Sequence, residues 1–596
     1  MGRRLERVVL PAGFALTATV LAVAFGYPVG SVLINAVVRG GRLTVAPVVD
    51  VLADPFYTGV AHSLVTDPRG VPAGIASWVA AGAPAVRLGL FGFTAYQALL
   101  STLASVALGL PGAYLLARYE FPGRSTVRSL TILPFVMPSI LVAVGFIATF
   151  SRHGLFNDLL GVVGVGPVTR LATLRMIVLA HAFYNAPLVI RLVAAAWESV
   201  DRRRIETARA LGASRTRAFR DVVLPQLLPS LLTAALLAFV FTFMSFPIVL
   251  ALGGLQLATV EVWIYALVGD LSLHEAATLA ALETAISLLL TYAYLRYEAR
   301  QAEFDAGGGS APPRRSLWVG SRTLGDPRRL GLLAYGAVAI VVFVGPLASV
   351  VIESVTGPGG GFTTAYYRFL LARQASTAVG TVKPLPAIAN SLAYGAGTLA
   401  LAVPMGVVVA VVATRDLPGS RLAETILSAP LAVSGVVLGL GLLQTFVFGT
   451  VLFGYRVTVA GPLAIVVAHA VIAYPFVTRN VAPALGGLDA SYADAARSLG
   501  ATRLRALLDV ELPLIWGALL AGAAFAFAIS VGEFDATVIL ASDVHSYTMP
   551  VALERYVGNR SIGPSLGPAT AMGTVLLAVT AASFVVIDRL GGRGQL

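Results

Sequence analysis

The sequence contains no cysteine, a single lysine (Lys383), and only 12% charged residues. Without cysteine, the chain can form neither a disulfide nor a thiolate metal site. With Lys383 alone, in Val-Lys-Pro, it has no G-x-x-x-x-G-K-[ST] loop for ATP phosphates, so it cannot be its own ATPase. A soluble globular protein carries about 25% charged residues, so the low charge argues against that class.

Long apolar runs are what the sequence has instead. Hydrophobic residues make up 57% of the chain and the mean hydropathy is +0.83. The runs 230–252, 330–352 and 514–530 contain no charged residue. About 20 apolar residues cross a bilayer as a helix, and backbone groups in lipid must hydrogen-bond internally. These runs therefore predict transmembrane helices.

The pattern predicts an all-α polytopic membrane protein with about twelve transmembrane helices. The first half covers 1–303 and the second 329–596, and a polar linker rich in glycine and proline covers 304–328. Such composition is typical of flexible linkers. The segment 71–93 is placed in a long external loop. The predicted spans are 9–37, 93–117, 127–150, 172–196, 228–252, 275–296, 330–354, 390–413, 422–448, 461–483, 514–540 and 567–588.

Arginines gather on one side of these spans. Three precede the first span, and seven follow the fourth between 202 and 220. Because Lys and Arg favour the cytoplasmic side, both termini are predicted to be cytoplasmic, in a multi-pass inner-membrane protein. The net charge of +12 is then explained by attraction to the anionic cytoplasmic leaflet, and it does not indicate binding to nucleic acid. The run 8–38 is too long for a signal peptide and predicts an uncleaved first span.

The two halves repeat each other. His181, Pro187 and Arg191 match His469, Pro475 and Arg479 at an offset of 288, and the match continues without a gap through the following loop. Further upstream the offset is 296, where Pro122 matches Pro418. Because each half has an even number of spans, the repeat is predicted to be parallel, with its axis along the membrane normal.

The matched loops are 201–225 (loop 1) and 489–513 (loop 2). An Asp at the start of each can cap a helix, and a Gly can end it in the left-handed conformation. A Ser or Thr then caps a second helix, which a Leu-Pro step is predicted to close. These positions are Asp201, Gly212, Ser214, Leu224 and Pro225 in loop 1, and Asp489, Gly500, Thr502, Leu512 and Pro513 in loop 2.

Each loop resembles the EAA motif of ABC-importer permeases. The motif positions are Glu206, Ala208, Gly212, Leu224 and Pro225 in the first copy, and Asp494, Ala495, Ala496, Gly500, Leu512 and Pro513 in the second. The resemblance implies a docking site for an ATPase subunit, where Ala208, Gly212, Ala496 and Gly500 allow close backbone approach. It also implies that Glu206 and Asp494 face or brace that contact. The alternative is that these two carboxylates pair with Arg209 and Arg497 on a solvated helix.

The resemblance also implies the fold and the partners. The fold would be that of a type I ABC-importer permease in the lipid bilayer. Two loops imply two copies of an ABC ATPase, which holds the ATP and magnesium, while this chain binds no cofactor or metal. An extracytoplasmic solute-binding protein would deliver the solute. A secondary transporter could show a parallel repeat too, but would lack the paired loops, and no catalytic cluster indicates an enzyme.

Over nearly the whole chain the sequence is similar to the fused permeases of iron(III), thiamine and phosphonate importers. Stretches such as 179–187, 258–261 and 530–534 look most like the thiamine type, which makes thiamine the first hypothesis for the solute and iron(III) or phosphonate the alternative.

Polar side chains at membrane depth are candidates for the solute pathway, because they are costly in lipid. Asn185, Glu283, Glu533 and Asp535 lie in predicted spans and form this candidate set. A cation such as thiamine would suit carboxylates and aromatic faces. The competing interpretation is structural: Glu283 would pair with a buried donor, and His181 and His469 would hydrogen-bond between helices.

Overall fold

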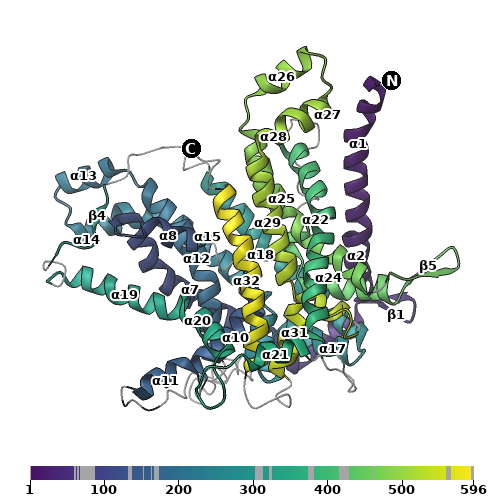
Figure 1. Ribbon diagram of the computed structural model, residues 1–596, viewed down its shortest axis with the longest axis horizontal. Coiled ribbons are helices and arrows are strands. Elements are labelled where there is room, and N and C mark those ends of the chain that lie inside the picture. Colours follow the sequence, from purple (N-terminus) through teal and green to yellow (C-terminus); the bar gives the residue numbers. More distant parts are fainter. Residues whose placement is uncertain are drawn as a thin grey trace.

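The computed structural model describes residues 2–59, 62, 66–67, 88–131, 137–151, 154–162, 164, 166, 174–302, 313–320, 325–372, 382–414, 429–459, 461–541, 543–558 and 566–591. Within this part of the chain, eight helices are long and apolar enough to cross a membrane, or up to eleven when three bent helix pairs count as single spans. Two shorter apolar helices overlap the predicted spans 422–448 and 567–588. The chain is therefore a polytopic all-α membrane protein, as predicted (Figure 1).

The first half begins with a broken helix and continues through long helices joined by short helical turns. Its elements are α1 (Gly2–Leu21), η1 (Ala22–Gly26), α2 (Tyr27–Asn35), β1 (Val38–Arg39), β2 (Arg42–Leu43), α3 (Ala46–Ala53), α4 (Pro55–Thr58), α7 (Gly89–Arg118), β3 (Tyr119–Glu120), α8 (Arg124–Leu130), α10 (Ser139–Phe150), α11 (Leu155–Val162), α12 (Leu174–Ser199), α13 (Arg202–Ala210), α14 (Arg215–Ala218), η3 (Phe219–Val223), α15 (Leu224–Phe243), α16 (Pro247–Gly253), η4 (Gly254–Leu257), α17 (Val260–Gly269) and α18 (Leu273–Ala302).

The linker and the second half follow the same plan. Their elements are β4 (Arg315–Ser316), α19 (Pro327–Phe343), α20 (Gly345–Ser354), α21 (Ala365–Ala372), α22 (Pro384–Thr414), η5 (Ala429–Ala432), α24 (Gly435–Leu442), η6 (Leu443–Val447), β5 (Thr450–Leu452), β6 (Tyr455–Val457), α25 (Pro462–Gly486), α26 (Ala490–Ser498), α27 (Arg503–Ala506), η7 (Leu507–Glu511), α28 (Leu512–Leu514), α29 (Trp516–Gly532), α30 (Asp535–Leu540), α31 (Met549–Gly558) and α32 (Gly567–Gly591).

Matching glycines let matching helices pack closely. In the first half α7 crosses α12, where a Cβ on Gly109 would lie 2.7 Å from the Cβ of Val189. In the second half α22 crosses α25, where a Cβ on Gly406 would lie 2.5 Å from the Cβ of Val477. Small residues at such crossings let helix backbones approach within a bilayer. The repeat seen in the sequence therefore extends to the packing of the two halves.

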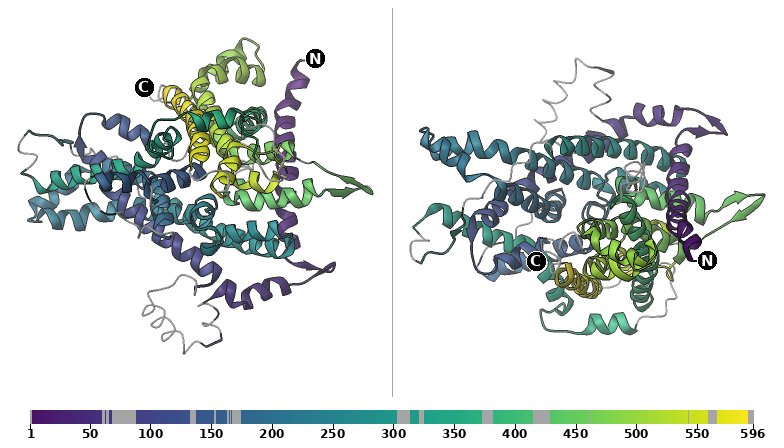
Figure 2. Two further views of the ribbon diagram at one scale, coloured as in Figure 1. Left: turned by 60° about the horizontal axis from the view of Figure 1, so that its bottom comes forward. Right: turned by 90° about the horizontal axis from the view of Figure 1, so that it is seen from above.

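The first span of each half packs on the opposite half. Helices α1 and α2 contact α22 and α24, and α19 and α20 contact α7 and α10. Figures 1 and 2 show α1 beside the second half, away from most of its own half. Where the halves meet, the rings of Phe246 and Phe534 stack with their centroids 5.6 Å apart. The exchange of first spans and this shared core join the two halves into one body.

The span predicted at 127–150 is wrong at its start, because α8 ends at Leu130 and the membrane helix begins only at Ser139. Two further predicted spans are wrong at their ends. The span predicted at 228–252 ends at Phe243, and the chain then forms α16 with η4, and α17, a pair bent by 75°. The span predicted at 514–540 ends at Gly532, before α30 begins. In both, a polar residue and a Phe interrupt the helix, Ser245-Phe246 in the first half and Glu533-Phe534 in the second. In the first half, an apolar run without charged residues does not reveal such a break.

Several sequence predictions lie partly outside the described residues. Of the loop predicted at 71–93, only 88–93 is described, and there α7 begins. The first part of the span 422–448 also lies outside them. Of the linker 304–328, residues 313–320 and 325–328 are described, and β4 pairs with β3 of the first half. This part of the linker is thus attached to the first half.

Candidate functional site

Loop 1 folds as the predicted helix–turn–helix. The Asp201 carboxylate accepts a hydrogen bond from the Arg203 backbone N–H at 2.9 Å and caps α13. Gly212 then takes φ +90°, a left-handed conformation that strains other residues. The Ser214 hydroxyl accepts from the Arg217 N–H at 3.2 Å and caps α14. Each turn of this loop therefore has a local cause in its own sequence.

Loop 2 repeats the same geometry. The Asp489 carboxylate accepts from the Ser491 N–H at 2.9 Å, and this hydrogen bond holds the pKa of Asp489 below its ordinary value. Gly500 takes φ +89°, and the Thr502 hydroxyl accepts from the Arg505 N–H at 3.4 Å. The predicted caps and turns are confirmed in both copies.

The predicted closing of the second helix at Leu-Pro is wrong in both loops. In loop 1 the helix continues through Leu224 and Pro225 as a single span, Arg215–Phe243. In loop 2 it continues past Leu512 and Pro513, and only after Leu514 does the chain bend by 81° into α29. A π-turn, η3 or η7, precedes each Leu-Pro step. The wider π-turn accommodates the ring and the missing N–H of proline without ending the helix.

The motif residues lie on the surface of the two loops. Glu206, Gly212, Leu224 and Pro225 are exposed and Ala208 is half-buried in loop 1; Asp494, Ala495, Gly500 and Pro513 are exposed and Ala496 and Leu512 are half-buried in loop 2. The carboxylates do not pair alike. Glu206 pairs with Arg202 at 2.5 Å instead of Arg209, whereas Asp494 pairs with Arg497 at 3.4 Å. Both ion pairs are exposed, so they leave the carboxylates accessible.

Sequence reasoning overlooked one feature of the loops. Leu211 is 84% exposed and Leu499 is 91% exposed, each directly before the left-handed glycine. Both leucines belong to the repeat, which was the available signal. A large apolar side chain held in water at the same place in both copies is typical of a docking surface. In Figure 1 the two loops lie at the far ends of their halves, opposite α17 and the β5–β6 hairpin.

The interior histidines join helices, as predicted. His181 on α12 lies 3.3 Å from the Ser101 hydroxyl and 2.8 Å from the Ser245 hydroxyl. His469 on α25 lies 2.8 Å from the Ser530 hydroxyl and also contacts the segment that follows α29. Asn185, a pathway candidate, donates to the Thr242 hydroxyl at 3.0 Å and so ties α12 to α15.

Glu533 has a structural role between α29 and α30. Its carboxylate accepts from the backbone N–H groups of Ala536 at 2.7 Å and Thr537 at 3.0 Å, which caps α30. It also lies 3.1 Å from Nε2 of His469. This pathway candidate is therefore engaged with its own half.

Three other acids, Glu261, Glu283 and Asp535, lie where the two halves meet; we call them the midline carboxylates. Glu261 and Glu283 are 0% and 1% exposed, and none of their carboxyl oxygens has a hydrogen-bond partner in the described residues. The Glu261 carboxyl lies beside the Ser434 hydroxyl and the Glu283 carboxyl, without hydrogen-bond geometry. The predicted buried donor for Glu283 is therefore not found among these residues. Glu261 was missed because its segment was read as a loop.

The third midline carboxylate comes from the second half. Asp535, on α30, interacts electrostatically with the carboxylates of Glu261 and Glu533. It fits against α24 because Gly435 has no side chain: a Cβ there would lie 2.7 Å from the Asp535 Cβ. Helices α17, α18 and α30 thus bring acids from both halves to one buried region.

Comparison with known proteins identifies the family. A family model described as "Binding-protein-dependent transport system inner membrane component" matches residues 109–300 and 402–593. The chain belongs to this family. Each match covers one half and contains one of the loops, so the chain is a fused two-half permease of an ABC importer.

Several relatives of this permease are named for the solute that they transport. The thiamine transport system permease protein ThiP of Brucella abortus is 29% identical over 496 residues, covering 82% of this chain and 85% of that protein. The Escherichia coli protein of the same name is 27% identical over 528 residues, covering 87% and 91%. A sulfate transport system permease protein, CysT of Salmonella typhimurium, is 30% identical over 210 residues, covering 35% of this chain and 75% of that protein.

Proposed function

We propose that this permease imports a small organic cation, thiamine or a close analogue. An external binding protein delivers the solute, and two copies of a separate ATPase dock at loops 1 and 2 and supply the energy. The observation that carries the solute proposal is the set of midline carboxylates. The similarity to permeases named for thiamine transport supports it.

Buried carboxylates without partners are costly in a membrane protein, and such groups mark pathways for ions and substrates. None of the midline carboxylates pairs with an arginine or lysine in the described residues. A passing cation would favour the ionised form of these acids and offset its desolvation, whereas sulfate or phosphonate would gain no such attraction. Because acids from both halves contribute, the site would change as the halves move.

Each loop is joined to the interior by a helix. In the first half the helix Arg215–Phe243 runs from loop 1 to the break at Ser245, whose hydroxyl contacts His181. Closure of the two ATPases on ATP would bring the loops together and tilt these helices, rocking the halves between two open states. This mechanism requires that the loops and both termini face the cytoplasm.

Reconstitution in proteoliposomes tests the proposal. With the partner ATPase and binding protein present, thiamine uptake should require ATP on the side of the membrane that loops 1 and 2 face. Uptake driven by a proton gradient without any ATPase would overturn the importer mechanism. ATP-driven uptake of iron(III) or phosphonate but not thiamine would overturn the solute.

A matched pair of variants tests the midline carboxylates. Glu283→Gln removes a carboxyl group that can ionise against a passing cation and should lower thiamine uptake about tenfold, as expected for loss of a contact to a charged group. Glu298→Gln makes the same change at an exposed position on the same helix, α18, and should leave uptake unchanged. Equal uptake by both variants would contradict the proposal.

A further inference from the structure

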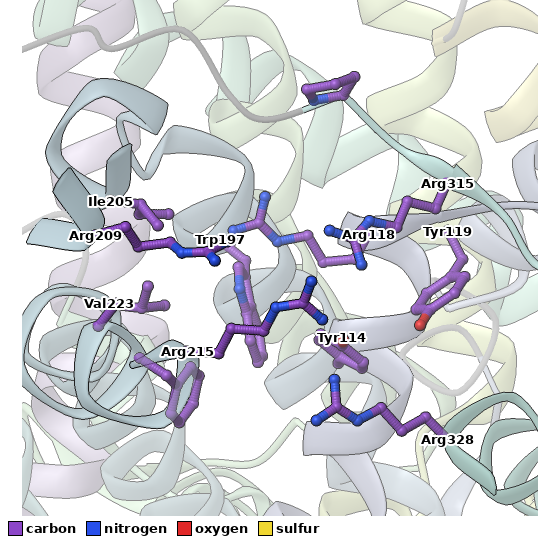
Figure 3. Close-up of a pocket in the computed structure, with 13 residues that line it drawn as sticks. Tyr114, Arg118, Tyr119, Trp197, Ile205, Arg209, Arg215, Val223, Arg315 and Arg328 are labelled. Carbon is purple, nitrogen blue, oxygen red and sulfur yellow. The ribbon is translucent and has the colours of Figure 1, made fainter. Parts of the chain in front are cut away.

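A cavity of about 240 Å³ lies beside loop 1 (Figure 3). Four parts of the chain that are distant in sequence line it: the end of α7 with β3, the segment from the end of α12 through α13, α14 and η3, the linker at β4, and the start of α19. Helix α19 belongs to the second half, so the cavity bridges the halves at the level of the docking surface.

Five arginines line this cavity: Arg118, Arg209, Arg215, Arg315 and Arg328. No side chain among these five has an ion pair or hydrogen bond within the described residues, and no carboxylate lines the cavity. Neighbouring arginines do have partners: Arg124 lies 2.9 Å and Arg314 lies 3.0 Å from the same Glu198 oxygen. Gathering five like charges without a counterion is unfavourable, which points to an anionic ligand.

An aromatic wall adjoins the arginines. The rings of Tyr119, Tyr114, Trp197 and Phe219 follow one another, with successive centroid distances of 5.7, 5.1 and 6.2 Å. All four residues line the cavity. An inorganic anion would make no apolar contact with these rings, whereas an organic group attached to the anion would pack against them.

The second half lacks this arrangement. Trp197 corresponds to Leu485 and Phe219 to Leu507. In α22, aligned on α7 by the packing of Gly406 and Gly109, Tyr114 corresponds to Val411. Loop 2 keeps the matching arginines Arg497 and Arg503, but the element that contacts it from the other half is α1. Because loop 2 has the coupling motif without the aromatic wall, docking of an ATPase does not require that wall.

We propose that the cavity beside loop 1 binds a small phosphate ester, with the phosphate on the arginines and the organic part on the aromatic wall. One guanidinium group can donate to two phosphate oxygens at once, which favours arginine over lysine at such sites. The volume falls below the roughly 300–1,000 Å³ of sites for drug-sized ligands, so the ligand is small. Occupancy would link α13 to β4 and α19, and so regulate the motion of loop 1.

Two sources share this chemistry, a soluble cytoplasmic phosphate ester and a phospholipid headgroup. The inference depends on the proposed function only in placing loop 1 in the cytoplasm. Binding is measured on the full chain in phosphatidylcholine nanodiscs, with AMP and inorganic phosphate as probes. One readout is the change in tryptophan fluorescence that is lost in Trp197→Phe, since the chain has five tryptophans. A second arm repeats the titration in nanodiscs that contain phosphatidylglycerol.

AMP should bind in phosphatidylcholine nanodiscs more tightly than inorganic phosphate. The double variant Arg315→Ala/Arg328→Ala should weaken AMP binding by about tenfold or more, since it removes two charged donors. Arg329→Ala is the matched control, because Arg329 pairs with Asp326 at 3.5 Å and does not line the cavity; it should bind AMP as the wild type does. If phosphatidylglycerol competes with AMP in the wild type but not in the double variant, the headgroup is the natural source.

The proposal is overturned if neither AMP nor phosphatidylglycerol distinguishes the wild type from the double variant. It is also overturned if the double variant binds AMP normally but loses the ATPase, because the arginines would then serve the protein interface. Failure of thiamine uptake by the wild type would reject the proposed function and leave this binding measurement intact.

Discussion

The two halves agree at the loops and differ in the interior. Both loops have an Asp cap, a left-handed glycine and a hydroxyl cap at matching positions. Inside, Ser245 of the first half corresponds to Glu533 of the second. Val260 begins α17 as Met549 begins α31, and their N–H groups donate to Thr94 and Ser391, so Glu261 corresponds to Pro550 and has no acid as its counterpart. Under the proposed function, two loops that dock identical ATPase copies would need the same geometry. An interior through which one asymmetric solute passes would not need matching residues in its two halves.

The strongest test of this comparison substitutes the left-handed glycines. Gly212→Arg and Gly500→Arg should each reduce ATP-driven uptake about tenfold or more, because a non-glycine residue in this conformation costs about 1–2 kcal/mol and the arginine adds bulk at the docking surface. Nothing lies within 4 Å of a Cβ at either position, so both variants should insert and fold. Uptake in proteoliposomes and the amount of membrane protein are measured together.

Gly454→Arg is the control for backbone strain. Gly454 has φ +83° and open surroundings, but lies in the β5–β6 hairpin away from the loops. It should retain uptake. If only one of the two loop variants loses uptake, the loops are not equivalent and the comparison fails.

The interior histidines should differ in their effect on stability. His469→Ala leaves the buried Glu533 carboxylate without its imidazole partner, 3.1 Å away, and losing a partner of a buried charged group costs more than losing that of a neutral one. His181→Ala removes hydrogen bonds to two serines only, which costs about 1–3 kcal/mol. Thermal unfolding in detergent should therefore show a larger fall in Tm for His469→Ala.

A double variant separates this explanation from simple loss of packing. Adding Glu533→Ser to His469→Ala reproduces the serine found at position 245 and removes the carboxylate that has lost its imidazole partner, while the serine hydroxyl can still cap α30. Its Tm should recover toward that of His181→Ala. A double variant as unstable as His469→Ala alone would show that the charge is not the cause.

Much of the loops could be predicted from the sequence because their geometry is local. The caps at Asp201 and Asp489 and the turns at Gly212 and Gly500 depend on side chains within a few residues. The end of α15 at Phe243 could not be predicted, because an apolar run looks the same whether the helix is straight or broken.

The interior was beyond sequence reasoning for a related reason. Which groups surround Glu283 depends on helices from both halves, and Glu261 lies in a segment too short to look like a span. The exchange of first spans likewise leaves no local signal, since α1 is equally apolar wherever it packs. The repeat identified which positions correspond, but their partners became clear only in three dimensions.

The smallest expected effect comes from the helix caps, and it should be equal in the two loops. The pKa of Asp489 lies below its ordinary value, so the cap is at full strength above the unfolded pKa and is lost only as pH falls through the depressed folded value. Between about pH 5 and pH 8, Asp489→Ala should therefore cause a small, pH-independent decrease in ATPase stimulation. Asp201→Ala removes the same cap from loop 1 and should cause a decrease of similar size. Asp489→Asn should be nearly neutral, since asparagine caps about as well as aspartate. A decrease for Asp489→Asn as large as that for Asp489→Ala would mean that the charge contacts the ATPase, and loop 2 would then differ from loop 1 in chemistry as well as in place.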